Sequence, residues 1–311
     1  MHGVVERKLW SDWFPSVKTL PSCTICESER TLALKENQVA YRGRRFSLYE
    51  CLDCSVWFSP AEDFYLVAND DYQEVFLKAE RQLAAERRFE IVETIDLKSF
   101  TKIVEIGCSL GDVLKMVRDR YPNATVCGLE DSLKMSEYVR ERGLQCYSSA
   151  AEVPFKADLI YANHVFEHFK HPDDFFRILK TLGESSFEVR ITFPNKDNFF
   201  IKKGLFPDLH LPQNRFYYSL EQVKKIFIKQ GFEILEARTL EKNRFADNLR
   251  QCLYNLLRED LGLFKQVIES LSNSLEIKIK GENIRDIEHY IEAMDLGSEG
   301  LIQARKVKKT P

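Results

Sequence analysis

The feature that most constrains this chain is the stretch 102–130, where a strand, a glycine turn, a helix and a second strand follow one another. "KIVEI" is a short apolar run typical of a buried strand, and "GCSLG" after it is a tight turn bounded by Gly107 and Gly111. "DVLKMVRDR" has the apolar spacing of a helix, and "ATVCGL" is a second strand followed by Glu130 and Asp131. This βαβ unit predicts an open α/β sheet that binds a ligand at the carboxyl end of its first strand.

The glycine turn does not fit the dinucleotide fingerprint G-x-G-x-x-G, because Gly107 is followed by Ser109 and Asp112. The pattern present is E-x-G-x-x-x-G, from Glu105 through Gly107 to Gly111. It resembles the D/E-x-G-x-G-x-G turn of the class I methyltransferases, with Ser109 in place of the middle glycine. The resemblance implies S-adenosylmethionine as the cofactor, held by these four residues. An α/β domain that binds another nucleotide is the alternative.

In that family an acid after the second strand binds the ribose hydroxyls, because a carboxylate can accept two hydrogen bonds from a diol. The resemblance assigns this role to Glu130 in "GLEDS", with Asp131 as the near alternative.

Later segments continue the order of a methyltransferase sheet. Strands are expected at 157–165 and 187–195, and a sixth strand after a helix that stops at Gly231. "GLIQARKVKK", residues 300–309, resembles the antiparallel strand that ends such sheets. The predicted fold is therefore a Rossmann-like α/β sheet, mostly parallel, with its last strand antiparallel.

The sequence divides into five expected parts: an N-terminal arm at 1–22, a zinc ribbon at 23–65, a methyltransferase domain at 66–240, a helical insertion at 241–296, and the last strand with a tail at 297–311. An amphipathic helix is expected over 71–96, before the first strand. The apolar stripes of the insertion indicate packing on the parent domain, a lid over the substrate, or a dimer contact.

Two C-x-x-C pairs near the start form the second strong pattern. Cys23 and Cys26 stand in "CTIC", and Cys51 and Cys54 stand in "CLDC". Four thiolates in this arrangement suit tetrahedral zinc, and the segment between the pairs reads as two strands with turns near Asn37 and Gly43. So short a segment cannot bury enough core to fold without a metal, which predicts a closed structural zinc site. A redox dithiol or free thiols are the alternative.

"YANHVFEHF", residues 161–169, contains H-x-x-E-H, the pattern of inverzincin proteases. Those enzymes carry both histidines on one helix, whereas here the pattern straddles a strand end: Asn163 and His164 close the strand, and Glu167 and His168 begin the next helix. In the methyltransferase order this is the loop that lines the methyl-donor pocket, which places Asn163 and His164 at the cofactor.

A second hypothesis for the same loop is a divalent metal. Some O-methyltransferases for quinone precursors and RNA ends carry E-x-x-E-H here and use a metal to hold substrate hydroxyls. This chain has His164 in place of the first glutamate, and a later loop offers His210 beside Glu167 and His168.

Methyl transfer asks mainly for in-line alignment and, for a hydroxyl acceptor, removal of a proton. A histidine that titrates near neutral pH suits proton removal. His168 and His210 are the candidates; a purely structural role is the alternative for each.

The formal charge of −3 argues against a broad electrostatic grip on nucleic acid. The sequence shows no secretory signal and no apolar run long enough to span a membrane, so a cytoplasmic protein is expected. The order of ribbon and methyltransferase resembles bacterial enzymes that methylate sugars and nucleotide-linked sugars. The alternatives are an RNA methyltransferase, since one such family also begins with a zinc ribbon, and a non-catalytic scaffold with a methyltransferase fold.

Overall fold

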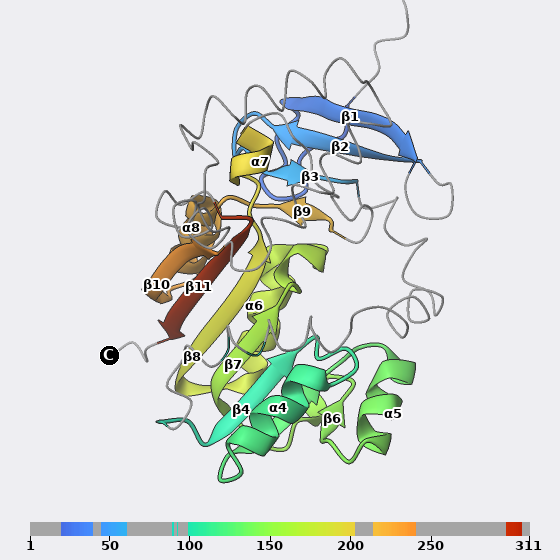
Figure 1. Ribbon diagram of the computed structural model, residues 1–311. Coiled ribbons are helices and arrows are strands. Elements are labelled where there is room, and N and C mark those ends of the chain that lie inside the picture. Colours follow the sequence, from blue (N-terminus) through green and yellow to red (C-terminus); the bar gives the residue numbers. More distant parts are fainter. Residues whose placement is uncertain are drawn as a thin grey trace, which may run out of the picture.

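The computed structural model describes residues 20–39, 45–60, 89, 92, 99–202, 214–240 and 297–306. Its strands form a seven-stranded sheet and a four-stranded sheet. Figure 1 shows the smaller sheet at one end of the strands of the larger one.

The larger sheet has the strand order β10-β11-β8-β7-β4-β5-β6. Its strands are β4 (Lys102–Ile106), β5 (Thr125–Leu129), β6 (Cys146–Tyr147), β7 (Ala157–Asn163), β8 (Gly183–Pro194), β10 (Glu233–Leu240) and β11 (Glu299–Lys306). From β8 to β6 neighbouring strands pair in parallel, whereas β11 pairs antiparallel with both β8 and β10. This confirms the predicted Rossmann-like sheet with an antiparallel last strand.

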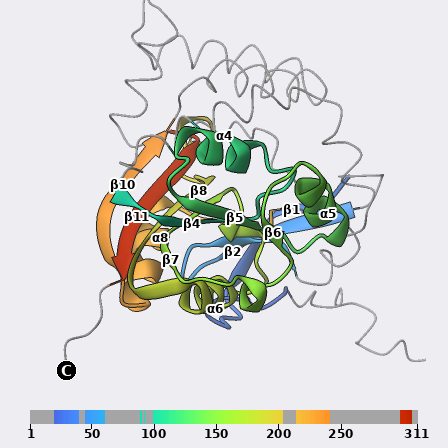
Figure 2. The same ribbon diagram turned by 90° about the horizontal axis from the view of Figure 1, so that it is seen from below.

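Helices cover both faces of this sheet, as Figure 2 shows. One face carries α4 (Asp112–Arg120) and α5 (Leu133–Glu141), and the other carries α6 (Pro172–Leu182) and α8 (Leu220–Lys229). Local sequence signals fix where these helices begin. Pro172 stands in the first turn of α6, where its missing N–H costs nothing, and Ser219 and Gln222 form a capping box at the start of α8. Short helical turns are η4 (Ala150–Glu152), η5 (Phe166–His168) and α7 (Phe199–Lys202).

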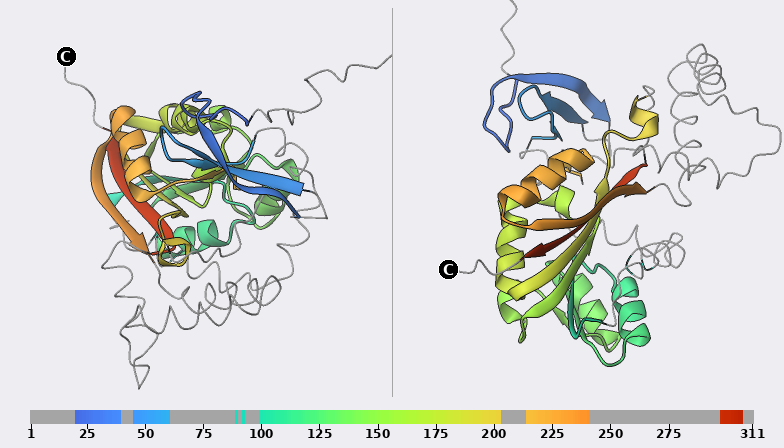
Figure 3. Two further views of the ribbon diagram at one scale, coloured as in Figure 1. Left: turned by 90° about the horizontal axis from the view of Figure 1, so that it is seen from above. Right: turned by 90° about the vertical axis from the view of Figure 1, so that its left-hand side faces the viewer.

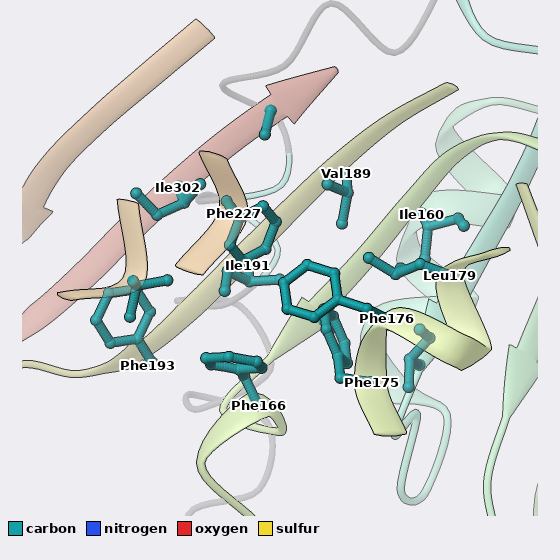
Figure 4. Packing of buried hydrophobic residues seen from close by; sticks show 14 of the residues in the cluster. Ile160, Phe166, Phe175, Phe176, Leu179, Val189, Ile191, Phe193, Phe227 and Ile302 are labelled. Atoms are coloured by element: carbon teal, nitrogen blue, oxygen red, sulfur yellow. The ribbon is translucent and has the colours of Figure 1, made fainter. Parts of the chain in front are cut away.

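The main core lies between the sheet and the α6–α8 face (Figure 4). Phe166 of η5 is fully buried at its centre, with ring centroids 5.2 Å from Phe175 and 5.1 Å from Tyr218. Aromatic side chains bury a large apolar area each and dominate the stability of a hydrophobic core. Hydrophobic packing of Phe166 therefore anchors the loop after β7.

The four-stranded sheet has the order β1-β2-β3-β9, with β1 (Thr31–Val39), β2 (Arg45–Cys51), β3 (Trp57–Phe58) and β9 (Phe216–Tyr217). We call β1–β3 with the cysteine pairs the ribbon. The expected turn at Asn37 is wrong, because β1 continues through Asn37 to Val39 and pairs there with the start of β2. Gly43 lies outside the described residues.

The ribbon is joined to the larger sheet by a strand from much later in the chain. Trp57 and Phe58 pair antiparallel with Tyr217 and Phe216 of β9, so the ribbon's sheet is completed from residues that follow β8. Figure 3 shows from the side that the ribbon lies beyond α8, at the end of the sheet where β8 finishes.

Several expectations fall outside the described residues: the N-terminal arm, the helix at 71–96 apart from residues 89 and 92, the insertion at 241–296, His210, and the tail after 306. The domain boundaries stay predictions. No helix in the described part of the chain has the length and apolar character needed to cross a bilayer.

Candidate functional site

The glycine turn after β4 has the backbone shape that its sequence predicts. Gly107, Ser109 and Gly111 all have positive φ, at 68°, 50° and 73°. The N–H of Gly107 donates to the Leu129 carbonyl at 2.7 Å, which ties the turn to the end of β5. Glycine is favoured at such positions because the left-handed region is strained for residues with a β-carbon. The following helix α4 begins at Asp112, as predicted.

Glu130 lies where β5 ends and faces the glycine turn. Its carboxylate accepts from the N–H of Ser109 at 2.9 Å and from the N–H of Ser132 at 3.1 Å. Burial raises the pKa of Glu130 to about 7, against the lowering effect of the Ser132 N–H. A carboxylate has about four lone-pair positions, so two remain for the donors of a ribose diol. The residues therefore fit S-adenosylmethionine at this turn.

Asp131 is exposed, which makes Glu130 the better placed of the two acids. Glu105, the first residue of the turn motif, is buried in β4, and the Tyr161 hydroxyl on β7 donates to it at 3.1 Å. Sequence analysis did not single out Tyr161. Its alternation with Asn163 along β7 places both side chains on the same face of the sheet.

The stretch "YANHVFEHF" crosses a strand end, as expected, but the strand stops one residue earlier. β7 ends at Asn163, and His164 takes a left-handed conformation with φ 54° before η5 begins at Phe166. The Thr192 hydroxyl on β8 donates to Asn163 Oδ1 at 3.3 Å. Because the histidines and Glu167 do not share a regular helix, the arrangement of a zinc protease is not formed.

His164 lies between two buried carboxylates. Its Nδ1 is 3.3 Å from Glu167 Oε1, and its Nε2 is 3.3 Å from Glu299 Oε2. Burial by itself lowers the pKa of His164, but the charge of Glu299 and the contact with Glu167 outweigh it and raise the pKa above the ordinary histidine value. Desolvation would raise the pKa of Glu167, yet the contact with His164 and the charge of His168 lower it. Sequence analysis missed Glu299, which begins β11 far along the chain.

His168 ends η5 and is partly buried. It is close enough to Glu167 to lower that residue's pKa. Among the described residues, the grouping suited to a metal is the four-cysteine set, and His164, Glu167 and His168 do not form another. The geometry thus gives no support to a second divalent metal at this loop.

The four ribbon cysteines come together as predicted. Their sulfur atoms all lie within 4.8 Å of one another, with Cys23 Sγ 3.7 Å from Cys54 Sγ and Cys26 Sγ 3.5 Å from Cys51 Sγ. A tetrahedral zinc with Zn–S bonds of about 2.3 Å requires sulfur separations of about 3.8 Å. The N–H of Ile25 donates to Cys23 Sγ and that of Cys54 to Cys51 Sγ, each at 3.4 Å, which orients the thiolates. The set fits a structural zinc ion.

Comparison with known proteins agrees with this geometry. The family model described as "Methyltransferase domain" matches residues 74–237, more than half of the chain. A malonyl-[acyl-carrier protein] O-methyltransferase from Ilyobacter polytropus is 26% identical over 195 residues, covering 58% of this chain and 70% of that protein. A trans-aconitate 2-methyltransferase from Rhodopseudomonas palustris is 26% identical over 144 residues, covering 43% of this chain and 56% of that protein.

A solved structure shows the same fold at low sequence identity. A chain of the complex between the Haloferax volcanii Trm112 methyltransferase activator and a methyltransferase superposes with a TM-score of 0.50, at 12% identity, over 79% of this chain and 98% of that one. With the family model spanning β4 to β8 and the glycine turn formed as its sequence requires, the chain belongs to the S-adenosylmethionine-dependent class I methyltransferases.

Proposed function

We propose that this enzyme transfers a methyl group from S-adenosylmethionine to a hydroxyl of a small sugar-like molecule, most simply a sugar or nucleotide-sugar. The cofactor supplies a methyl group already activated by its sulfonium. The chain's own task is then alignment of an in-line attack and removal of the hydroxyl proton.

The cofactor side of the proposal rests on one observation. Gly107, Ser109 and Gly111 turn the backbone at the end of β4, and the Glu130 carboxylate lies directly across from them. In the proposed complex, Glu130 accepts hydrogen bonds from a ribose diol while the backbone of the glycine turn lies against the rest of the cofactor. Asn163 and His164, at the end of the adjacent strand β7, line the same edge.

The acceptor side is proposed between the ends of β7 and β8 and the ribbon. Buried polar side chains gather after β8, among them Asn195, Lys196 and Asn198. Asn195 also bridges to Tyr218, next to the strand that pairs with the ribbon. Amide groups can both donate and accept hydrogen bonds, which suits a hydroxyl-rich acceptor. The overall charge of −3 argues against RNA, which is the alternative.

His168 and His210 are the proposed groups for removing the hydroxyl proton. His168 follows Glu167 in η5, on the loop after β7 that borders this acceptor region. His210 remains a candidate from sequence alone. The curated relatives favour a second candidate acceptor, because they are named for malonyl-[acyl-carrier protein] and trans-aconitate. An acidic small molecule or carrier-bound acyl group therefore belongs in any acceptor screen.

The ribbon cysteines are proposed to hold one structural zinc, since all four positions of a tetrahedral ion are filled by protein sulfur. The methyl-transfer step would not pass through this metal. A cytoplasmic location also stays a prediction. It agrees with the four ribbon cysteines being outside disulfides, since thiols stay reduced in the cytoplasm.

The cofactor assignment is tested by calorimetric titration of metal-analysed protein with S-adenosylmethionine. Glu130→Gln keeps the shape of the side chain and still accepts through one oxygen, but it loses the charge. We expect its dissociation constant to rise by about tenfold or more. Asp131→Asn is the matched control and should stay within about twofold, because an exposed charge is largely screened by solvent. Equal losses of affinity in both variants would mean that Glu130 does not make the ribose contact that we propose.

The acceptor is tested with S-adenosylmethionine labelled in its methyl group. The enzyme is offered a panel of nucleotide-sugars, a malonyl carrier-protein thioester, small polycarboxylates and total RNA in separate reactions. Label in the sugar fraction supports the proposal. Label only in the acyl or carboxylate fraction replaces it with the second candidate, and label only in RNA establishes the alternative.

A further inference from the structure

The backbone at His164 has a conformation that few residues with a β-carbon adopt. Its φ of 54° lies in the left-handed region, which histidine and asparagine enter more often than most residues. The N–H of His164 donates to the Thr192 carbonyl at 3.0 Å, which fixes one side of the residue to β8.

The next residue, Val165, connects His164 to the glycine turn. A β-carbon placed on Gly107 would lie 2.5 Å from Val165 Cγ2, so the Val165 side chain rests directly on the Gly107 backbone. Any shift of the backbone at His164 therefore moves the surface against which the turn is packed. Close packing transmits such shifts because it leaves no space to absorb them.

The imidazole is held from both of its nitrogens by carboxylates of different origin. Glu167 belongs to η5, three residues along the chain, whereas Glu299 begins β11. Glu299 itself is firmly placed, since it pairs with Pro194 in the sheet and is preceded by Gly297 and Ser298. Asn195 fixes the backbone just before Glu299: its Nδ2 donates to the Gly297 carbonyl at 2.9 Å, and its backbone N–H donates to the Ser298 carbonyl at 2.8 Å.

We propose that Glu299 is a positioning residue that, through the His164 imidazole, fixes the end of β7 against the glycine turn and thereby sets the affinity for S-adenosylmethionine. The proposal rests on the proposed function, because it takes the glycine turn to be the cofactor site. It assigns a role in cofactor binding to a residue far along the chain from the glycine turn, through its contact with His164.

The charge of His164 gives the proposal a pH signature. Two carboxylates, Glu167 in η5 and Glu299 in β11, act on His164 directly. Two further titratable groups interact with Glu167: His168, whose charge lowers the pKa of Glu167, and Tyr218, whose pKa is raised by burial and then by the charge of Glu167. The raised pKa of His164 extends its charged form to a higher pH than in an ordinary histidine. The two ion pairs are therefore complete below that pKa and are lost as the pH rises through it.

Glu130 should cause a loss of cofactor affinity at the opposite, acid end of the pH range. Its pKa of about 7 means that the carboxylate which receives the ribose diol is protonated as the pH falls. Affinity for S-adenosylmethionine should therefore pass through a maximum, limited by Glu130 on the acid side and by His164 on the alkaline side.

The experiment measures the dissociation constant of S-adenosylmethionine by calorimetry from about pH 5.5 to about pH 9.5, with the full-length, zinc-loaded protein. Glu299→Gln should weaken binding by about tenfold at neutral pH and move the alkaline limb to lower pH. His164→Asn should remove the alkaline limb, and asparagine is well suited to a left-handed backbone. Glu236→Gln is the control: it removes a carboxylate of β10 that pairs with Arg190 and Arg238 elsewhere in the same sheet, and its profile should match that of the wild type.

The outcomes separate the two claims. If the wild-type protein does not bind S-adenosylmethionine, the proposed function fails. If it binds and Glu299→Gln keeps the wild-type affinity and pH profile, the positioning role is overturned. If Glu299→Gln does not fold, as judged by circular dichroism and zinc content, His164→Asn decides: an unchanged alkaline limb overturns the proposal, and its loss supports it.

Discussion

The two ends of the sheet's carboxyl-terminal edge are assembled in different ways. At β4 and β5, the glycine turn and Glu130 come from one continuous stretch, and the hydrogen bonds that join them lie within residues 107–132. At β7 and β8, the neighbouring residues come from distant stretches around 57–59, 163–167, 214–218 and 297–299. The first end depends on local backbone shape. The second depends on long-range assembly and on the ribbon.

Backbone hydrogen bonds connect the ribbon to the loop after β7. The N–H of Ser59, which follows β3, donates to the Arg215 carbonyl at 2.9 Å, and the N–H of Arg215 donates to the Glu167 carbonyl at 3.1 Å. Glu167 in turn contacts His164. The position of the acceptor end is therefore tied to the folding of the ribbon by backbone hydrogen bonds, whereas the backbone N–H groups of Gly107 and Gly111 donate to Leu129 and to Cys108 within the turn.

The largest predicted effect removes a ribbon cysteine. Cys51→Ser takes away one of four metal ligands, and metal-coupled folding free energies are on the order of 10 kcal/mol. We expect loss of zinc and rapid amide exchange in β1–β3 and at Ser59, Arg215 and Phe216. Amides of β4 and β5 should stay protected. Hydrogen exchange followed by mass spectrometry measures both regions in one experiment.

Cys127→Ser is the control for that experiment, because Cys127 is a buried thiol of β5 that is not part of the ribbon. It should keep its zinc. Protection at Arg215 that survives in zinc-free Cys51→Ser would show that the acceptor end does not depend on the ribbon.

The next effect concerns the aromatic core under the loop after β7. Phe166→Ala should lower the free energy of unfolding by about 3–5 kcal/mol, because the ring is fully buried against Phe175, Phe176, Tyr218 and Phe227. Urea unfolding monitored by circular dichroism gives the value. Phe166→Leu fills most of the space and should cost less than half as much. A similar small cost for both would mean that the core does not hold this loop.

How much could be foreseen follows the same division. The glycine turn, α4 and Glu130 were predicted at the observed positions, because each depends on residues close in sequence. The cysteine site was predicted because two short motifs report it even though the pairs are far apart. The contact of Glu299 with His164 and the β3–β9 pairing could not be predicted. In both cases the partners are far apart in the sequence, and no local motif indicates that they meet. The prediction of a turn at Asn37 was wrong, because strand pairing outweighs the statistical preference of asparagine for turns.

A smaller effect tests the local shape of the cofactor end. Gly107→Ala introduces a β-carbon at φ 68°, against Val165 at 2.5 Å, and should cost about 1–3 kcal/mol of stability together with cofactor affinity. The double variant with Val165→Ala removes the clash but keeps the left-handed backbone. Thermal unfolding of the single and double variants separates the two contributions. No rescue by Val165→Ala would place the whole cost in the backbone conformation.

The smallest predicted effect isolates one contact between the two regions. Gln222 does two things at the start of α8: its Oε1 accepts from the N–H of Ser219 at 2.7 Å in the capping box, and its Nε2 donates to the Cys54 carbonyl at 2.6 Å. Glutamate at this position keeps the capping interaction but has no donor for Cys54. Gln222→Ala loses both interactions.

We therefore expect Gln222→Glu to leave the stability of the sheet nearly unchanged while weakening the ribbon's attachment by about 1 kcal/mol. Gln222→Ala should show the same weakening plus about 1 kcal/mol of lost capping. The attachment is measured as the rate of zinc transfer to a chelator, and the sheet as the unfolding midpoint. Faster zinc release in both variants, with a lowered midpoint only in Gln222→Ala, would show that the ribbon is held by specific contacts with α8 as well as by its metal. Equal zinc release from all three proteins would leave the β3–β9 pairing as the attachment that matters.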